Sequence, residues 1–300
     1  LALAAGAAGR AGAATEEAGA VLPLVLDSGW KAADGDPPDG VAGIDRLEFR
    51  PADPMRDQAP REGVRWYRVL VDLSAFVGQP LAFQADGIRD VDEAWFDGVR
   101  IGGLGEFPPA SDTAHFASRL YPLPTDRVDG AGPRELVLRV WHGRRDGSVL
   151  RAAPVIGRLD LLARERGLRD QSLVLFLGCC LVVAVFLVLF SFHARSPADY
   201  LLFAGFAAGL GAYAMLGHSA WSEGLVPPGT VFRAGIVALG GLSVCYGAAM
   251  LRFLGAGVPL GYRVALPAFG LLALSALVVP GVESFVVPLQ LFRWAFAALL

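Results

Sequence analysis

The spacing of hydrophobic residues divides the chain into two halves. In residues 22–162, apolar and polar side chains alternate in short runs separated by turns rich in Gly, Pro and Asp. Residues 171–300 consist mainly of long apolar runs, and four of these contain no charged residue: 172–192, 200–217, 234–251 and 264–282. Alternation with a period of two is typical of β-strands, and an uncharged run of about 20 residues can cross a bilayer as a helix. The pattern predicts a β-sheet domain followed by an α-helical transmembrane bundle.

The strands of the first half each have one apolar face. In the runs at 64–72 and 135–141 this face is formed by Tyr67, Val69 and Val71 and by Leu136, Leu138 and Val140, respectively. Further strands are expected at 81–85, 93–96 and 99–101. Between the last two lies Asp97-Gly98, which predicts a type I′ hairpin because both central residues of that turn need a positive φ. Short strands joined by such turns favour an antiparallel β-sandwich.

Domain boundaries follow from these patterns. Residues 1–20 are rich in Ala and Gly and are interpreted as the remnant of a secretory signal peptide, with a flexible leader as the alternative. We expect the β-sandwich at 21–163, a juxtamembrane link at 164–171 and the transmembrane bundle at 172–300. A fifth apolar run, interrupted by the end of the sequence, covers 285–300.

The charges in the short connections between spans predict the orientation. Arg195, Arg252 and Arg263 lie in the first and third connections. The second connection carries Glu223 and, at the edge of the next span, Arg233, and the fourth carries Glu283. Because short cytoplasmic loops are enriched in Lys and Arg, the first and third connections are expected in the cytoplasm. Three arginines just before the first span oppose this orientation, but large domains are translocated largely regardless of charge. We therefore expect a multi-pass protein of a bacterial inner membrane with its N-terminal domain in the periplasm.

Composition and motifs argue against several functions. The net charge is −3 and no basic face is evident, which gives no support for a nucleic-acid partner. The three cysteines all lie in apolar runs, and neither they nor the four histidines have metal-ligand spacing. The sequence contains no Gly-x-Ser-x-Gly elbow and no phosphate-binding glycine loop. We expect no enzyme within these residues, no metal and no cofactor.

A series of short motifs resembles the galactose-binding-like jelly rolls, sugar-binding modules of glycoside hydrolase family 2 and of several bacterial sensor proteins. The motifs are GVRWYR at 63–68, the GQP turn at 78–80, and the segments 83–90, 93–103, 105–108 and 135–141. They occur in the order found in that family, over about 80 residues. Asp97 stands where the family usually has Asn. The resemblance implies a jelly-roll β-sandwich.

A domain of this kind ahead of a multi-span bundle resembles the bacterial seven-transmembrane receptors with diverse intracellular signalling modules. In that family a cytoplasmic output domain follows, either a diguanylate cyclase, a histidine kinase or a serine/threonine phosphatase. The resemblance implies a sensor that detects a carbohydrate-like or other small ligand, or a partner, and signals to an output beyond residue 300. The alternative is a transporter or membrane-assembly subunit whose β-sandwich docks partner proteins. Membrane lipid is a partner in either case, and a homodimer stays open.

The candidate ligand-binding residues share the strand faces opposite the apolar ones. Trp95 alternates with Phe96, so if Phe96 is in the core, Trp95 points outward. Aromatic rings and charged groups of this kind bind sugars, which gives the candidate set Trp95, Glu93, Asp97, Arg68, Arg139, Trp141 and His115. Trp95 could instead cap the core, contact the membrane bundle or contact a second copy. Arg293 lies halfway along its apolar run and is either an intramembrane functional residue or a side chain that reaches the interface.

Overall fold

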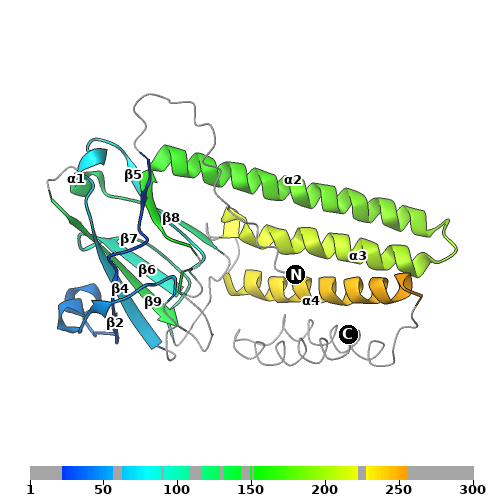
Figure 1. The fold of residues 1–300 in the computed structure, drawn as a ribbon, viewed down its shortest axis with the longest axis horizontal. Coiled ribbons are helices and arrows are strands. Elements are labelled where there is room, and N and C mark those ends of the chain that lie inside the picture. Colours follow the sequence, from blue (N-terminus) through cyan, green and yellow to red (C-terminus); the bar gives the residue numbers. More distant parts are fainter. Residues whose placement is uncertain are drawn as a thin grey trace.

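Two antiparallel β-sheets precede three long helices (Figure 1). The computed structural model describes residues 22–56, 63–88, 91–108, 117–128, 132–142, 149–150, 152–221 and 228–255. One sheet has the strand order β1-β10-β5-β8, with β1 at Leu24–Val25, β10 at Val155–Arg158, β5 at Leu81–Asp86 and β8 at Ser118–Pro122. The other has the order β3-β2-β4-β9-β6-β7, with β3 at Arg50–Pro51, β2 at Lys31–Asp34, β4 at Gly63–Val71, β9 at Arg134–His142, β6 at Val91–Phe96 and β7 at Val99–Leu104. We call the two sheets together the β-domain.

The two sheets share one hydrophobic core. Phe83 and Ile156 from the four-stranded sheet belong to the same buried cluster as Tyr67, Leu138 and Phe96 from the six-stranded sheet. The apolar faces predicted for β4 and β9 are therefore the inner faces. This placement follows from the period of two, since every second side chain of a strand points to the same side.

The hairpin between β6 and β7 has the predicted turn. Asp97 has φ +46° and Gly98 has φ +75°, so both central residues are in the left-handed region that a type I′ turn requires. Asp97 is the only residue other than glycine with a positive φ among the described residues. Its side chain helps to hold this conformation, because Oδ1 accepts a hydrogen bond from the backbone N–H of Glu135 at 2.9 Å.

An ion pair between the sheets lies inside the core. The side chains of Asp92 on β6 and Arg119 on β8 are both 0% exposed, and Nε of Arg119 donates to Oδ1 of Asp92 at 2.8 Å. The hydroxyl of Tyr121 donates to the other carboxylate oxygen at 2.8 Å. Burial and the Asp92 carboxylate raise the pKa of Tyr121 well above its usual value, so the hydroxyl stays protonated and acts as the donor. The pair thus links the two sheets through charged hydrogen bonds shielded from water.

Among the described residues, three helices are long and apolar enough to cross a membrane: Leu159–Ser191, Pro197–Gly217 and Arg233–Phe253. They correspond to α2 at Leu159–Ser191, to α3 at Pro197–Ala214 with the short η3 at Met215–Gly217, and to α4 at Pro228–Phe253. These helices overlap the first three predicted spans. The spans predicted at 264–282 and 285–300 lie outside the described residues.

Helix α2 begins before the first predicted span. Its first residue, Leu159, directly follows the last residue of β10, so residues 164–171, predicted as a juxtamembrane link, are helical and continuous with the apolar run. At 33 residues the helix is about 50 Å long, which exceeds the ~30 Å of a bilayer's hydrocarbon core. The backbone N–H of Leu159 bonds to the carbonyl of Pro80, just before β5, and Leu162 is buried. The first turns of α2 therefore pack against the β-domain (Figure 1).

Glycines bring the long helices close together. A Cβ on Gly205 of α3 would lie 2.9 Å from Sγ of Cys245 on α4, and one on Gly209 would lie 3.5 Å from the backbone of Leu242. A Cβ on Gly211 would lie 2.9 Å from Cys180 on α2. Small residues on such faces let helix backbones approach within a membrane. Gly205 and Gly209, four residues apart on α3, thus lie at its contact with α4.

The buried ion pair leads to a stability prediction. Asp92→Asn leaves the Arg119 guanidinium buried without its counter-charge, so we expect the free energy of unfolding of the β-domain to fall by about 3–5 kcal/mol. Denaturant unfolding of the chain in detergent, followed by tryptophan fluorescence, measures this. As a control, Asp126→Asn removes an exposed carboxylate and should change stability by less than about 0.5 kcal/mol. Equal effects of the two variants would contradict the prediction.

A second prediction concerns Gly102 on β7. A Cβ there would lie 2.3 Å from the ring of Tyr121, which is held in place by Asp92. Gly102→Ala should therefore lower the free energy of unfolding by about 1–3 kcal/mol through overpacking. Gly167→Ala is the matched control, because a Cβ on Gly167 of α2 meets nothing within 4 Å and alanine favours the helix. An unchanged denaturation midpoint in the Gly102 variant would refute the proposed steric role.

Candidate functional site

Five of the candidate residues lie on the outer face of the six-stranded sheet: Arg68, Glu93, Trp95, Arg139 and Trp141. In the strand register, Arg139 of β9 lies between Trp66 of β4 and Glu93 of β6. One row along, Val137 lies between Arg68 of β4 and Trp95 of β6. The alternation that sends Phe96 and Leu138 into the main core sends these side chains to the opposite side.

Trp95 points away from the main core but is not exposed. It is 8% exposed, and its ring packs on that of Trp66 with 5.4 Å between the centroids. Together with Val137 and Ile44 the two tryptophans form a second, smaller hydrophobic cluster, which we call the outer core. A ring buried in this way offers no open face to a sugar. Of the roles considered for Trp95, its packing with Trp66, Val137 and Ile44 corresponds to a residue that caps the core.

A short 3-10 helix covers the outer core. This helix, η1, runs over Gly40–Arg46. The tryptophan cluster is contacted by two of its residues, Val41 and Ile44, and by Leu47 and Phe49, which follow it. Since a 3-10 helix has three residues per turn, residues spaced by three lie on one side. The spacing of Val41, Ile44 and Leu47 is the sequence signal that would have predicted this covering segment.

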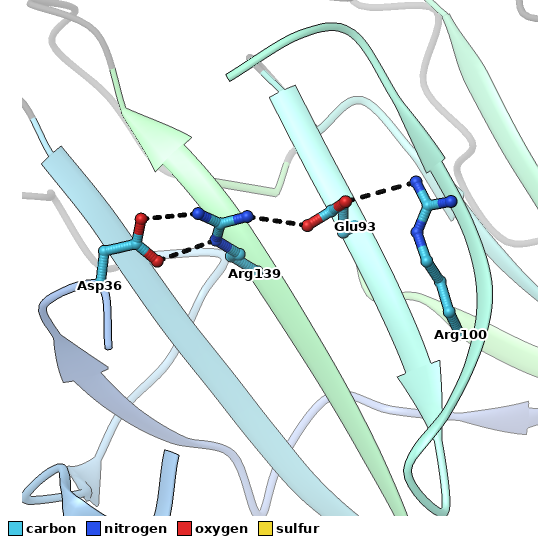
Figure 2. A network of polar contacts seen from close by, with 4 residues as sticks. All are labelled: Asp36, Glu93, Arg100 and Arg139. Atoms are coloured by element: carbon cyan, nitrogen blue, oxygen red, sulfur yellow. Dashed lines mark hydrogen bonds and ion pairs between the residues drawn. The ribbon is translucent and has the colours of Figure 1, made fainter. Parts of the chain in front are cut away.

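A network of four charged side chains lies beside the outer core (Figure 2). Arg139 forms a bidentate ion pair with Asp36, in which Nε donates to Oδ1 at 3.0 Å and Nη2 donates to Oδ2 at 2.6 Å. Its third nitrogen, Nη1, donates to Oε2 of Glu93 at 2.9 Å. The other oxygen of Glu93 lies 3.3 Å from Nη2 of Arg100 on β7. The network therefore runs across the sheet from the segment after β2 to the edge strand β7.

Aromatic rings frame the central guanidinium. The Cζ atom of Arg139 lies 4.0 Å from the ring centroid of Phe107 and 5.7 Å from that of Trp66. Burial lowers the pKa of Arg139, but the hydrogen bonds to Asp36 and Glu93 outweigh burial and raise it above its usual value. Arg139 therefore stays charged.

The ends of the network are open to solvent. The side chains of Arg100 and Asp36 are 58% and 42% exposed, whereas those of Arg139 and Glu93 are 20% and 22% exposed. Two carboxylates and two guanidinium groups give no net charge. Such a surface presents donors and acceptors at its ends, next to the half-buried ring of Phe107. Among the described residues, no group of three His, Cys, Asp or Glu could hold a metal ion.

The remaining candidate residues do not join this network. Arg68 lies over the ring of Phe49 at 4.1 Å and pairs with Asp45 and Glu135. Asp97 is engaged in its own turn and with Arg134. Trp141 is on the same sheet face but is 6% exposed. His115 and Arg293 lie outside the described residues.

Asp36, Arg100 and Phe107 were not among the predicted site residues. Asp36 and Arg139 are 103 residues apart in the sequence, so no local pattern relates them. Arg100 follows the hairpin turn, and the expected pairing of β6 with β7 places it near β6; this is the one signal that the sequence offered.

No family model matches the sequence, and no curated protein matches it. Among solved structures, a glycosyl hydrolase family 2 member from Bacteroides cellulosilyticus DSM 14838 is 14% identical with a TM-score of 0.34, over 46% of this chain and 20% of that chain. A β-glycosidase from Bacteroides vulgatus is 14% identical with a TM-score of 0.35, over 45% and 20%. The β-glucuronidase of Ruminococcus gnavus is 13% identical with a TM-score of 0.34, over 45% and 28%. The chain thus matches less than a third of the length of each of these enzymes, and their activities are not transferred to it.

Breaking the bidentate contact between Arg139 and Asp36 is expected to loosen the segment 36–49. Arg139→Lys keeps the charge but cannot bind Asp36 with two parallel bonds, so we expect a loss of about 1–2 kcal/mol in the free energy of unfolding. Hydrogen exchange of residues 36–49 should become faster, because Arg139 holds this segment to the sheet. The control is Arg127→Lys, which changes an exposed ion pair with Asp126 on the short helix α1 at Thr125–Val128. The interpretation fails if both variants leave exchange at 36–49 unchanged.

Proposed function

We propose that the chain is the sensing part of a bacterial inner-membrane receptor. In this proposal the β-domain is a jelly roll of the galactose-binding-like kind, lies in the periplasm and binds a carbohydrate-like or other small ligand. The helices pass the change to a cytoplasmic output of the full-length protein, either a diguanylate cyclase, a histidine kinase or a phosphatase. The observation that carries the proposal is the direct passage of β10 into α2 at Arg158 and Leu159.

This passage supports mechanical coupling between the β-domain and the membrane. β10 is hydrogen-bonded to β1 on one edge and to β5 on the other, so its position depends on the four-stranded sheet. The helix that follows has no flexible residue at its start, because Leu159 bonds back to Pro80 and Leu162 is buried. A shift of the sheet therefore moves α2 as a body. A ligand drives such a shift only if it binds one arrangement better than the other.

The charged network supports the choice of ligand. Hydroxyl groups of a sugar pair with carboxylates and guanidinium groups, and an aromatic ring covers an apolar sugar face. The exposed ends of the network at Asp36 and Arg100, with Phe107 beside Arg139, provide this combination. Because Arg139 also holds residues 36–49 to the sheet, a ligand that competes for Asp36 would alter the cover of the outer core.

The far end of the bundle supports the proposed orientation. Arg252 at the end of α4 pairs with Asp199 in the first turn of α3, and Nη2 of Arg252 lies 3.2 Å from Oγ of Ser196. These residues and Arg195 lie at the helix ends opposite the β-domain (Figure 1). Positive residues in short loops favour the cytoplasmic side, which leaves the β-domain outside.

The test is binding of a panel of neutral sugars and uronic acids to the chain in lipid nanodiscs. A ligand at one hundred times its Kd should stabilise the chain by about 2.7 kcal/mol, and its thermal shift should disappear in Arg139→Gln but persist in the control Arg127→Gln. The same ligand should change hydrogen exchange in α2, α3 or α4.

Two results would contradict parts of the proposal. If no panel member produces a thermal shift, the carbohydrate class is wrong. If a ligand binds and exchange in the membrane helices stays unchanged, the β-domain does not signal through them. The alternative of a transporter or assembly subunit that docks partner proteins would then be favoured.

A further inference from the structure

Three parts of the chain meet at one turn of α2, near the point where its apolar part begins. Arg166, Arg169 and Asp170 belong to this turn. They contact Asp86 at the end of β5 and Ser219 in the connection between α3 and α4. We call this place the junction.

On the side of the β-domain the junction depends on one carboxylate. Nη1 of Arg169 donates to Oδ2 of Asp86 at 2.7 Å. Asp86 also accepts hydrogen bonds from Oγ of Ser118 on β8 at 2.5 Å and from Nε2 of Gln84 at 3.2 Å. Within the described part of the chain, Nε and Nη2 of Arg169 are buried and have no hydrogen-bond partner. Arg169 is therefore held to β5 and β8 through Asp86 alone.

On the side of the membrane bundle the junction clamps one residue. Asp170 is 9% exposed, and its Oδ1 accepts a hydrogen bond from the backbone N–H of Ser219 at 3.1 Å. Nη2 of Arg166 donates to the carbonyl oxygen of Ser219 at 3.3 Å. Ser219 is buried and begins η4, the short helix at Ser219–Trp221. Both backbone groups of one residue in the α3–α4 connection are thus bound by α2.

Helix geometry explains how one turn serves both sides. Residues 166 and 170 are four apart and lie on the same side of the helix, where both reach Ser219. Residue 169 is rotated by about 100° from residue 170 and faces β5 instead. Since Arg169 and Asp170 are neighbours on a rigid helix, a displacement of one displaces the other.

We propose that the junction is the coupling element that carries the state of β5 and β8 to the α3–α4 connection. The signal then reaches α3 and α4 across the turn at residues 166–170, in addition to any movement along α2. This inference rests on the proposed function for its purpose. The coupling itself is a property of the chain and is measurable without a ligand or an output domain.

The experiment is hydrogen exchange of the full chain in nanodiscs of phosphatidylethanolamine and phosphatidylglycerol. Asp86→Asn keeps the shape of the side chain and removes the charge that holds Arg169. We expect exchange to rise at least about threefold at residues 215–221, which Asp86 does not touch, as well as in β5 and β8. Arg169→Gln removes the other partner of this ion pair and should raise exchange in the same residues.

A matched variant and a double substitution complete the test. Asp72→Asn removes a β-domain carboxylate that, among the described residues, is hydrogen-bonded to the neighbouring Ser74 alone, and it should leave exchange at 215–221 unchanged. Asp86→Asn combined with Asp170→Ala should raise exchange there by less than the product of the two single effects, since both act through one turn.

Three results would overturn the proposal. The first is faster exchange in β5 and β8 with no change at 215–221. The second is an equal rise at 215–221 in Asp72→Asn, which would show general loosening of the β-domain. The third is a double variant whose effect equals the product of the single effects. A chain that binds no sugar yet shows the expected pattern would retain this coupling while the proposed ligand class fails.

Discussion

Strand β10 is hydrogen-bonded on both edges, to β1 and to β5, and the chain leaves it into α2 without an intervening residue. The chain turns back after Arg158, which pairs with Leu81 at the start of β5. Because β10 and β5 are antiparallel, α2 then runs along β5 toward Asp86 at its end. This constraint determines where the bundle of long helices begins and which end of the sheet it meets. It also brings Arg169 to β5, while the neighbouring Asp170 contacts the α3–α4 connection.

The six-stranded sheet is buried on both faces in its centre, although antiparallel sheets often leave one face to water. Its inner face shares the main core with the other sheet, and its outer face holds Trp66 and Trp95 under η1. The charged network borders this outer core, and Arg139 belongs to both, since it contacts Asp36 and Glu93 while lying near the ring of Trp66. The ion pairs of the network and the packing of the outer core are therefore linked through one side chain.

The features that could be predicted from the sequence are those with a local period. Alternation placed Tyr67 and Leu138 in the core, the Asp97-Gly98 pair marked its turn, and apolar length located three helices. Alternation also gave the direction of Trp95, but a period of two says nothing about what covers a strand face, so burial of Trp95 was one of several alternatives that the sequence left open. The contacts of Arg139 with Asp36 and of Arg169 with Asp86 join segments 103 and 83 residues apart, and charged residues at such distances leave no pattern along the chain.

The course of α2 along β5 also determines how far the β-domain lies from the apolar part of this helix. The turns of α2 that precede the apolar run lie beside the sheet, so within the described residues they form no stalk between the β-domain and that apolar part. In the receptor proposed above, this geometry places the β-domain close to the lipid surface. A soluble small molecule diffuses freely to such a surface, whereas a fixed polymer is bound only where it already lies within reach of the domain. The geometry therefore fits the proposed small ligand.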